Sequence, residues 1–323
     1  MYADFLGFLL TQKELMTKDP NATFDPSVAL DLCHVTVAPP TIKTVRGVIE
    51  EYHWFIRIAE KAGATWVLRE RDFERPGLKL VGGLQSPPDD ATYEDLGLMR
   101  GAGIIFMTLA YQGLSRFGGG FAEPDEHLTC RGEDLLEAMS AVGMSLDLAH
   151  VGETTARDAL DYIEARSLPL RVVATHTGCQ AVYHYDRNLP DDILERVAAL
   201  DGLVGIATLT FALHESDNTL GPFRRHLDHA IEICGEDHVA IGTDGIYKTI
   251  DLREQEAIFA MMKAKIDPGN ILRARFPDQP VELNSASRMA IIKDVLFDAG
   301  IHPATVEKLC GDNLFAFLRS VLS

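Results

Sequence analysis

Short apolar segments of strand length alternate with longer segments of helical periodicity along most of the chain. The strand-like segments lie within 2–8 and at 28–37, 78–84, 103–109, 144–150, 171–176, 202–209 and 238–242. The segments with apolar residues at helical spacing lie at 41–61, 93–100, 131–141, 153–165, 190–200 and 220–234. This alternation is typical of βαβ units, which place their strands in one parallel sheet.

The number of these units favours a closed barrel over an open sheet. About eight strand–helix units are visible, which is the number that closes a (β/α)8 TIM-like barrel. A doubly wound open sheet is the alternative, but no GxGxxG follows the first strand and no P-loop is present. Beyond Leu252 only helical patterns remain, so we expect extra C-terminal helices. No linker or repeat divides the chain, and we expect residues 1–323 to form a single α/β domain.

Composition narrows the classes of partner. The chain has 30 Lys and Arg against 48 Asp and Glu, a formal charge of −18, which argues against binding to nucleic acid or anionic membranes. No apolar run approaches the ~20 residues that a membrane helix needs, and the N-terminal FLGFLL lacks the basic flank of a signal peptide. Five scattered cysteines without a CxxC motif suit a reducing compartment, and we expect a cytoplasmic protein.

Two strand-like segments each end in a histidine. Met144 to His150 reads MSLDLAH, and Arg171 to His176 reads RVVATH. Because the carboxyl ends of successive barrel strands meet at one mouth, the two imidazoles are expected side by side, where functional residues of this fold lie. Neutral imidazole is a common zinc ligand. The pair therefore predicts a metal site, although either histidine alone could be a structural core residue.

Two charged residues follow later strands of the same barrel. Asp244 ends the last strand, in IGTDG, where it could ligate a metal or take a proton from an activated water. Arg187, on the loop after the His176 strand, could hold a substrate carboxylate with two parallel hydrogen bonds. A turn role for Asp244 and a helix-capping context for Arg187 are the competing interpretations.

These segments, in this order, resemble the membrane (renal) dipeptidase family of zinc peptidases, within the amidohydrolase-like barrels. The resemblance rests on LTCRGEDLLEAMSAVGMSLDLAHVGETT, VVATHTGCQAVYHYDRNLPDDILERVA, HLDHAIEICGEDHVAIGTDG and GDNLFAFLRSV. It implies a (β/α)8 barrel with two zinc ions that cleaves dipeptides, often with a D-residue at the C-terminal position, and that is often a dimer.

By the same resemblance, His150 and His176 would bind one zinc. Arg187 would bind the carboxylate of a small dipeptide-like substrate, and Asp244 would serve proton transfer near the metal.

The other half of the family's metal site departs from the pattern. The family's first strand carries a His-x-Asp pair of ligands, but those positions hold Leu6 and Phe8 when Asp4 is aligned before the motif, or Tyr2 and Asp4 when the alignment is shifted. The bridging Glu of the family falls at Gln85. A first strand lying upstream of Met1 is a further possibility.

A substrate-polarising His of the family falls at Tyr111, which we expect to contact the substrate. We therefore expect one zinc ion, with two or another divalent metal as alternatives. His150 and His176 would hold it, with water and either Gln85 or Asp244 completing the shell. The expected function is metal-dependent hydrolysis of a dipeptide or related small amide. The alternative is a catalytically impaired relative that binds a small molecule or acts on another substrate class.

Overall fold

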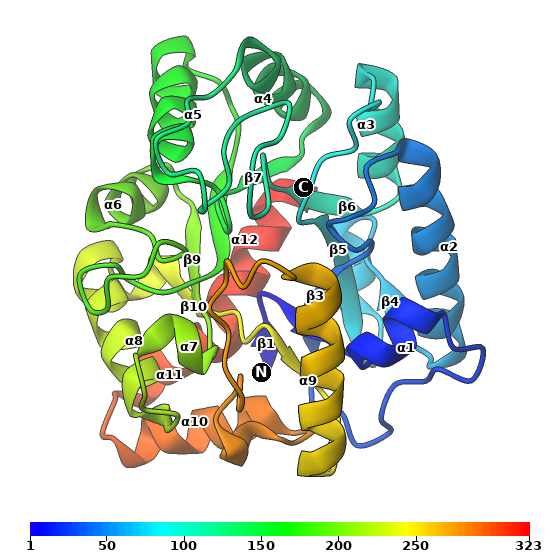
Figure 1. The fold of residues 1–323 in the computed structure, drawn as a ribbon, viewed down its shortest axis with the longest axis vertical. Coiled ribbons are helices and arrows are strands. Elements are labelled where there is room, and N and C mark those ends of the chain that lie inside the picture. The colour runs from blue at the N-terminus through cyan, green and yellow to red at the C-terminus, as the bar shows by residue number, and fades with distance from the viewer.

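Eight parallel strands form a nearly closed barrel in this computed structural model, which describes residues 1–323 (Figure 1). In order around the sheet they are β1 (Ala3–Asp4), β3 (Leu32–Thr36), β5 (Lys79–Leu84), β6 (Ile104–Met107), β7 (Ser145–Asp147), β8 (Val172–Thr177), β9 (Leu203–Ile206) and β10 (Val239–Ile241). The two ends of the sheet meet where the Phe5 amide donates to the Ile241 carbonyl at 2.8 Å. The predicted barrel is therefore confirmed.

Three short strands lie outside this ring. β4 (Thr65–Trp66) adds to the edge of β5. β2 (Gly7–Phe8) pairs in parallel with β11 (Gly245–Ile246), just beyond the ends of β1 and β10. This small ladder draws Phe8 and the residues after Thr243 to the same mouth of the barrel.

Most of the helices form an outer layer around the barrel. The outer layer contains α2 (Val45–Lys61), α3 (Tyr93–Gly101), α4 (Cys130–Val142), α5 (Glu153–Arg166), α6 (Asp191–Ala199), α8 (Leu220–Cys234), α10 (Arg288–Asp298) and α11 (Pro303–Glu307). The remaining ones are α1 (Gln12–Thr17), α7 (Thr210–Leu213), α9 (Leu252–Ile266), a π-helical turn at Lys308–Asp312, α12 (Asn313–Leu322) and 3-10 turns at Glu70–Glu74, Glu236–His238 and Val281–Leu283. None of them combines the length and apolar character needed to cross a bilayer.

The sequence explains why the outer helices form and how they dock. In α2, Thr44 caps the first turn by accepting from the Gly47 amide at 3.2 Å. Val48, Phe55 and Ala59 then fall on one side of the helix and are buried against the sheet. The same arrangement in the other outer helices produces one continuous apolar layer between the strands and the helices.

α12 closes the amino-terminal end of the barrel. Its Phe317 ring stacks on Phe106 with 6.2 Å between centroids, and Phe106 meets Phe5 edge-on at 5.4 Å. Other members of this cluster, such as Leu32 and Leu203, begin their strands. Because apolar packing fills this end, the polar chemistry is left to the carboxyl ends of the strands.

Two buried aspartates join neighbouring strands by the same device. Asp147 Oδ1 accepts from the Ala149 and Thr175 amides at 3.0 and 2.9 Å, and its Oδ2 accepts from Thr175 Oγ1 at 2.6 Å. Asp4 repeats the pattern at the junction of β1 and β10. Its Oδ1 accepts from the Leu6 and Thr243 amides at 3.0 and 2.9 Å, and its Oδ2 from Thr243 Oγ1 and Tyr247 Oη, both at 2.6 Å.

Most predicted elements are present with shorter strands than expected. The clearest difference is β7, which ends at Asp147, so that His150 lies in the following turn instead of in a strand. The Asp147 side chain accounts for this difference, because its bond to the Ala149 amide turns the chain away from the ladder. The one strand expected within 2–8 is divided into β1 and β2, and α1 and β11 were not predicted, since each is too short to show periodicity.

The hydrogen bonds that Asp4 accepts are called the Asp4 clamp below, and those of Asp147 the Asp147 clamp. We expect the Asp4 clamp to be a main determinant of barrel closure. Asp4→Ala leaves four buried donors without an acceptor, and each such group costs about 1–3 kcal/mol. Allowing for relaxation, the free energy of unfolding should fall by about 3 kcal/mol or more in urea denaturation. Asp4→Asn should cost less, because its carbonyl can still accept from both amides. Asp298→Ala, at the exposed end of α10, is the control, and an equal small effect of Asp4→Ala and Asp298→Ala would contradict this account.

Candidate active site

Two imidazoles and an amide meet at the carboxyl ends of the strands. His150 Nε2 and His176 Nε2 are 3.0 Å apart, and Gln85 Nε2 lies 3.4 Å from His176 Nε2. All three residues are buried. A half-turn of the Gln85 amide about its last side-chain bond places its oxygen toward the imidazoles.

The orientation of His176 is set by the Asp147 clamp. Thr175 Oγ1 donates to Asp147 Oδ2 and lies 2.8 Å from His176 Nδ1. Because this hydroxyl uses its only proton in the hydrogen bond to the carboxylate, it can only accept a hydrogen bond from His176. Nδ1 of His176 is then the protonated nitrogen, and Nε2 has a lone pair. The register of β8 against β9 also shifts between Ala174 and Thr177. Such an irregularity breaks strict alternation and can re-aim a side chain.

His150 is held in an unusual backbone conformation. Its φ is +68°, a left-handed value that costs a residue with a Cβ about 1–2 kcal/mol and is often retained at functional sites. The Tyr111 ring covers the imidazole at a centroid distance of 4.2 Å. Nδ1 of His150 is buried without a hydrogen-bond partner, so the ring is positioned by packing and by its Nε2 contacts.

Arg187 and Asp244 face the histidine pair from the next loops. Arg187 is almost fully buried, with Nη2 at 3.3 Å from His150 Nε2 and 3.8 Å from Asp244 Oδ2. Its Nη1 has no partner. Asp244 also has a left-handed φ, +52°, and follows directly on Thr243 of the Asp4 clamp.

The electrostatic environment keeps the imidazoles neutral. Burial lowers the pKa of both His150 and His176 well below the ordinary value, and the positive charge of Arg187 lowers it further. Burial raises the pKa of Asp244 to about 7, although Arg187 opposes this shift. A neutral imidazole with a free Nε2 lone pair is the form that binds a metal.

The donors fit one metal ion in part. Two nitrogens that each lie 2.0–2.1 Å from a tetrahedral zinc are about 3.3 Å apart, close to the observed 3.0 Å separation. No group of three or more His, Cys, Asp or Glu residues is arranged to hold a metal anywhere in the chain. The fit therefore requires water or the Gln85 amide as further ligands.

The positions expected for a second ion carry no ligand. Leu6 is fully buried, and Phe8 lines the same pocket as His150. Asp4 is engaged by its four donors at the β1–β10 junction, so it serves the barrel instead of a metal.

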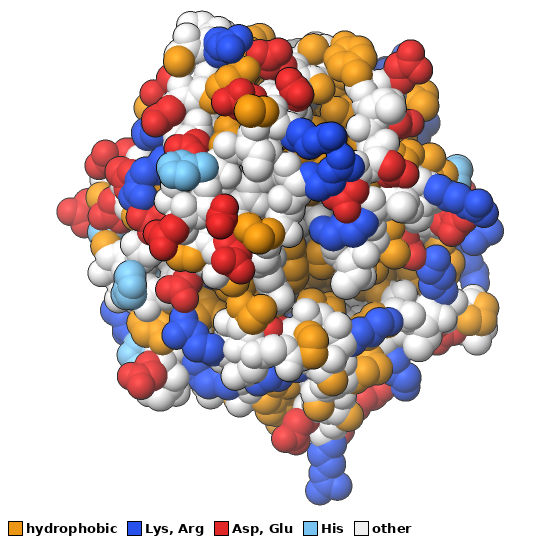
Figure 2. Space-filling model, turned by 45° about the horizontal axis from the view of Figure 1, so that its top comes forward, with side chains coloured by type: hydrophobic (Ala, Val, Ile, Leu, Met, Phe, Trp, Pro, Cys, Tyr) orange, Lys and Arg blue, Asp and Glu red, His pale blue; other side chains and the backbone are white.

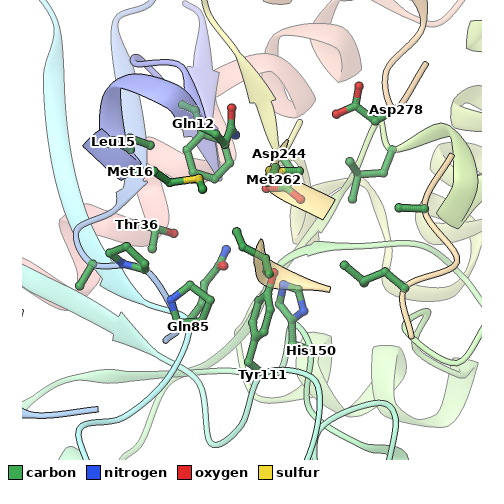
Figure 3. A pocket seen from close by; sticks show the side chains of 18 of the residues that line it. Gln12, Leu15, Met16, Thr36, Gln85, Tyr111, His150, Asp244, Met262 and Asp278 are labelled. Carbon is green, nitrogen blue, oxygen red and sulfur yellow. The ribbon is translucent and has the colours of Figure 1, made fainter. Parts of the chain in front are cut away.

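The site opens into one pocket with a cavity volume of about 150 Å³. Figure 3 shows Gln85, Tyr111 and His150 at the bottom of this space, with Leu15 and Met16 of α1 above them on the left and Asp244 above them on the right. On the molecular face in Figure 2, charged side chains of both signs surround a central hollow in which hydrophobic side chains are exposed.

Sequence reasoning brought together the residues that meet here but missed several that shape the site. His150, His176, Gln85, Tyr111, Arg187 and Asp244 all lie at one mouth of the barrel, and their chemical roles remain predictions. The sequence analysis did not identify Thr175, or the side chains of α1 and α9 that line the pocket. The Thr immediately before each of His176 and Asp244 was the available signal for the clamps.

Comparison with known proteins places this arrangement in a family. A family model described as membrane dipeptidase, peptidase family M19, matches residues 30–260. An uncharacterised protein from the pqqA 5′ region of Klebsiella pneumoniae is 32% identical in an alignment of length 204 that covers 59% of this chain and 72% of that protein. An uncharacterised dipeptidase of Schizosaccharomyces pombe is 32% identical over 124 residues, 38% of this chain and 29% of that longer protein.

A solved structure shows the same fold. It is a metallopeptidase from Rhodobacter sphaeroides, liganded with a phosphinate mimic of the dipeptide L-Ala-D-Ala, and it superimposes with a TM-score of 0.76 at 17% identity. The superposition covers 100% of this chain and 99% of the other. With the family model matching well over half of the residues, the chain belongs to the membrane dipeptidase family, peptidase family M19.

Proposed function

We propose that this protein hydrolyses a dipeptide or a related small amide with one zinc ion held by His150 and His176. The observation that carries the proposal is the 3.0 Å approach of two neutral, buried Nε2 atoms, with Arg187 and Asp244 beside them. Membership of a dipeptidase family supports the reaction class. The Rhodobacter metallopeptidase with its dipeptide mimic supports a small peptide as the substrate.

Each residue then has a chemical task. Bound zinc would supply a water activated for attack, because it lowers the pKa of that water to about 7. Asp244 would accept the proton of the attacking water and return it to the leaving amine, a task suited to a carboxyl with a pKa near neutrality. Arg187 would hold the substrate carboxylate through the free Nη1 and fix the scissile bond over the histidines.

Gln85 and Tyr111 complete the proposed site. The Gln85 amide would provide a third, neutral ligand through its oxygen, next to His176. Tyr111 covers His150 and would contact the substrate. Burial raises the pKa of the Tyr111 hydroxyl, so it remains a neutral hydrogen-bond donor.

We also propose that the protein is cytoplasmic and forms a homodimer. All five cysteines are unpaired, which suits the reducing cytoplasm. A homodimer is part of the proposal by likeness to the family, and it can be tested by sedimentation.

We predict one equivalent of zinc per chain in protein purified without chelators, measured by plasma mass spectrometry. His150→Ala and His176→Ala should each reduce zinc below about a tenth of an equivalent, because one imidazole with water binds zinc weakly. His53→Ala, at an exposed position on α2, is the matched control and should retain zinc. Two equivalents in the unmodified protein would refute the single-ion site.

Thr175→Val should weaken zinc binding without removing a ligand. The valine keeps the shape of the side chain but cannot orient the His176 ring, and loss of such a supporting bond typically costs about 10–100-fold in affinity. Competition with a chromogenic chelator measures the change. Thr243→Val removes the equivalent hydroxyl from the Asp4 clamp, and its zinc affinity should stay unchanged. Equal effects in the two variants would show that Thr175 acts only through stability.

Asp244→Asn should reduce kcat/KM for dipeptide hydrolysis by about 10²–10⁴-fold, the usual contribution of a general base, while zinc content is retained. Asp278→Asn is the control, because Asp278 lines the same pocket without pairing with Arg187. Retention of full activity by Asp244→Asn would remove the proton-transfer role assigned here.

A further inference from the structure

The pocket above the histidines is divided into a polar floor and an apolar wall. The floor consists of side chains at or beyond the strand ends: Gln85, Tyr111, His150, Arg187 and Asp244. The wall is formed mainly by apolar side chains of α1, α2, α9 and the segment after β3, among them Leu15, Met16, Trp54, Phe259, Met262 and Ile266. A molecule that fills this space therefore needs one polar end and one apolar end.

Much of the apolar wall is not covered by protein. Leu15 and Met16 on α1, and Met262 and Ile266 on α9, line the pocket but remain partly exposed. α1 contains no buried residue at all. Figure 1 shows α1 and α9 near each other at the front of the barrel, and Figure 3 shows the α1 side chains directed into the pocket. Their burial would be completed by an occupant of the cavity, which favours an apolar one.

The floor supplies a cation for the polar end of the occupant. Arg187 is nearly fully buried, its Nη1 is unpartnered, and its nearest carboxylate oxygen, on Asp244, is 3.8 Å away. A buried guanidinium with so distant a counter-charge is suited to an anion from outside. On the wall side, Glu51 is already paired with Lys18 at 2.8 Å, so it offers no charge to a ligand.

We propose that the pocket selects carboxylates that carry a compact apolar group, about the size of a benzene ring, and that it discriminates against polar or charged groups at that position. The proposal rests on the proposed hydrolase function and narrows its substrates to amides of this kind. A cavity of about 150 Å³ with apolar walls holds a benzene-sized group. The only polar side chain of α1 and α9 that lines the pocket is Gln12, which is uncharged, so a second carboxylate or an ammonium placed against these helices would lose its hydration without finding a counter-charge.

Calorimetric titration of the full-length protein as purified tests this selectivity with three acids that share a carboxylate. 3-Phenylpropionate should bind at least about tenfold more tightly than propionate, because only its ring covers the exposed wall. Glutarate, which places a charge against the wall, should bind no better than propionate. Equal affinities for the three acids, tighter binding of glutarate, or no binding of 3-phenylpropionate would each overturn the proposal.

Variants on two separate helices locate the selectivity. Met262→Lys on α9 and Met16→Lys on α1 should each abolish the preference for 3-phenylpropionate over propionate, and using both guards against a failure of one to fold. Ala257→Lys carries the same charge at an exposed position of α9 and should retain the preference. Retention of the full preference by both pocket variants would place the ring elsewhere and contradict the assignment.

The binding readout separates this inference from the proposed function. Tight, ring-dependent binding in a protein that hydrolyses no dipeptide would preserve the selectivity and end the hydrolase proposal. Hydrolysis of Ala-Asp as efficiently as Ala-Phe, together with equal binding of the three acids, would preserve the hydrolase and overturn the selectivity.

Discussion

The account depends on two imidazole nitrogens that face each other in a buried space. Thr175 and Asp147 fix the His176 tautomer so that its Nε2 is free, and His150 Nε2 faces it at 3.0 Å. Arg187, which can only donate, also points at His150 Nε2. Because two facing lone pairs repel, nitrogens this close are joined either by a ring proton or by a metal ion. The arrangement is therefore suited to a metal, and His150 takes its place in it with a left-handed φ of +68°.

The barrel supports the site through one device used twice. In each case a buried aspartate accepts bonds from the amide two residues on and from a threonine that lies in the next strand of the ring, Thr175, or just after it, Thr243. Thr175 immediately precedes His176, and Thr243 immediately precedes Asp244. The hydrogen bonds that join the strands therefore also help to position His176 and Asp244. We infer that changes at Asp4 and Asp147 act on both stability and function, whereas α12 at the opposite end acts on stability alone.

Sequence patterns predicted the barrel, and with it the meeting of His150 with His176, because parallel strands bring their carboxyl ends to one mouth. They did not predict the end of β7 at Asp147 or the irregular register in β8, since both arise from side-chain bonds between distant residues. The apolar character of the pocket was also missed. Phe8 was recognised only as a lost ligand, and α1 and α9 cover the mouth through contacts that no local periodicity reveals.

X-ray diffraction data collected above and below the zinc absorption edge, from crystals of protein never exposed to chelators, test the central claim most directly. The account predicts one anomalous peak per chain, about 2.0–2.1 Å from both His150 Nε2 and His176 Nε2. A map with no peak between these nitrogens, or with a second ion beside Phe8, would contradict it.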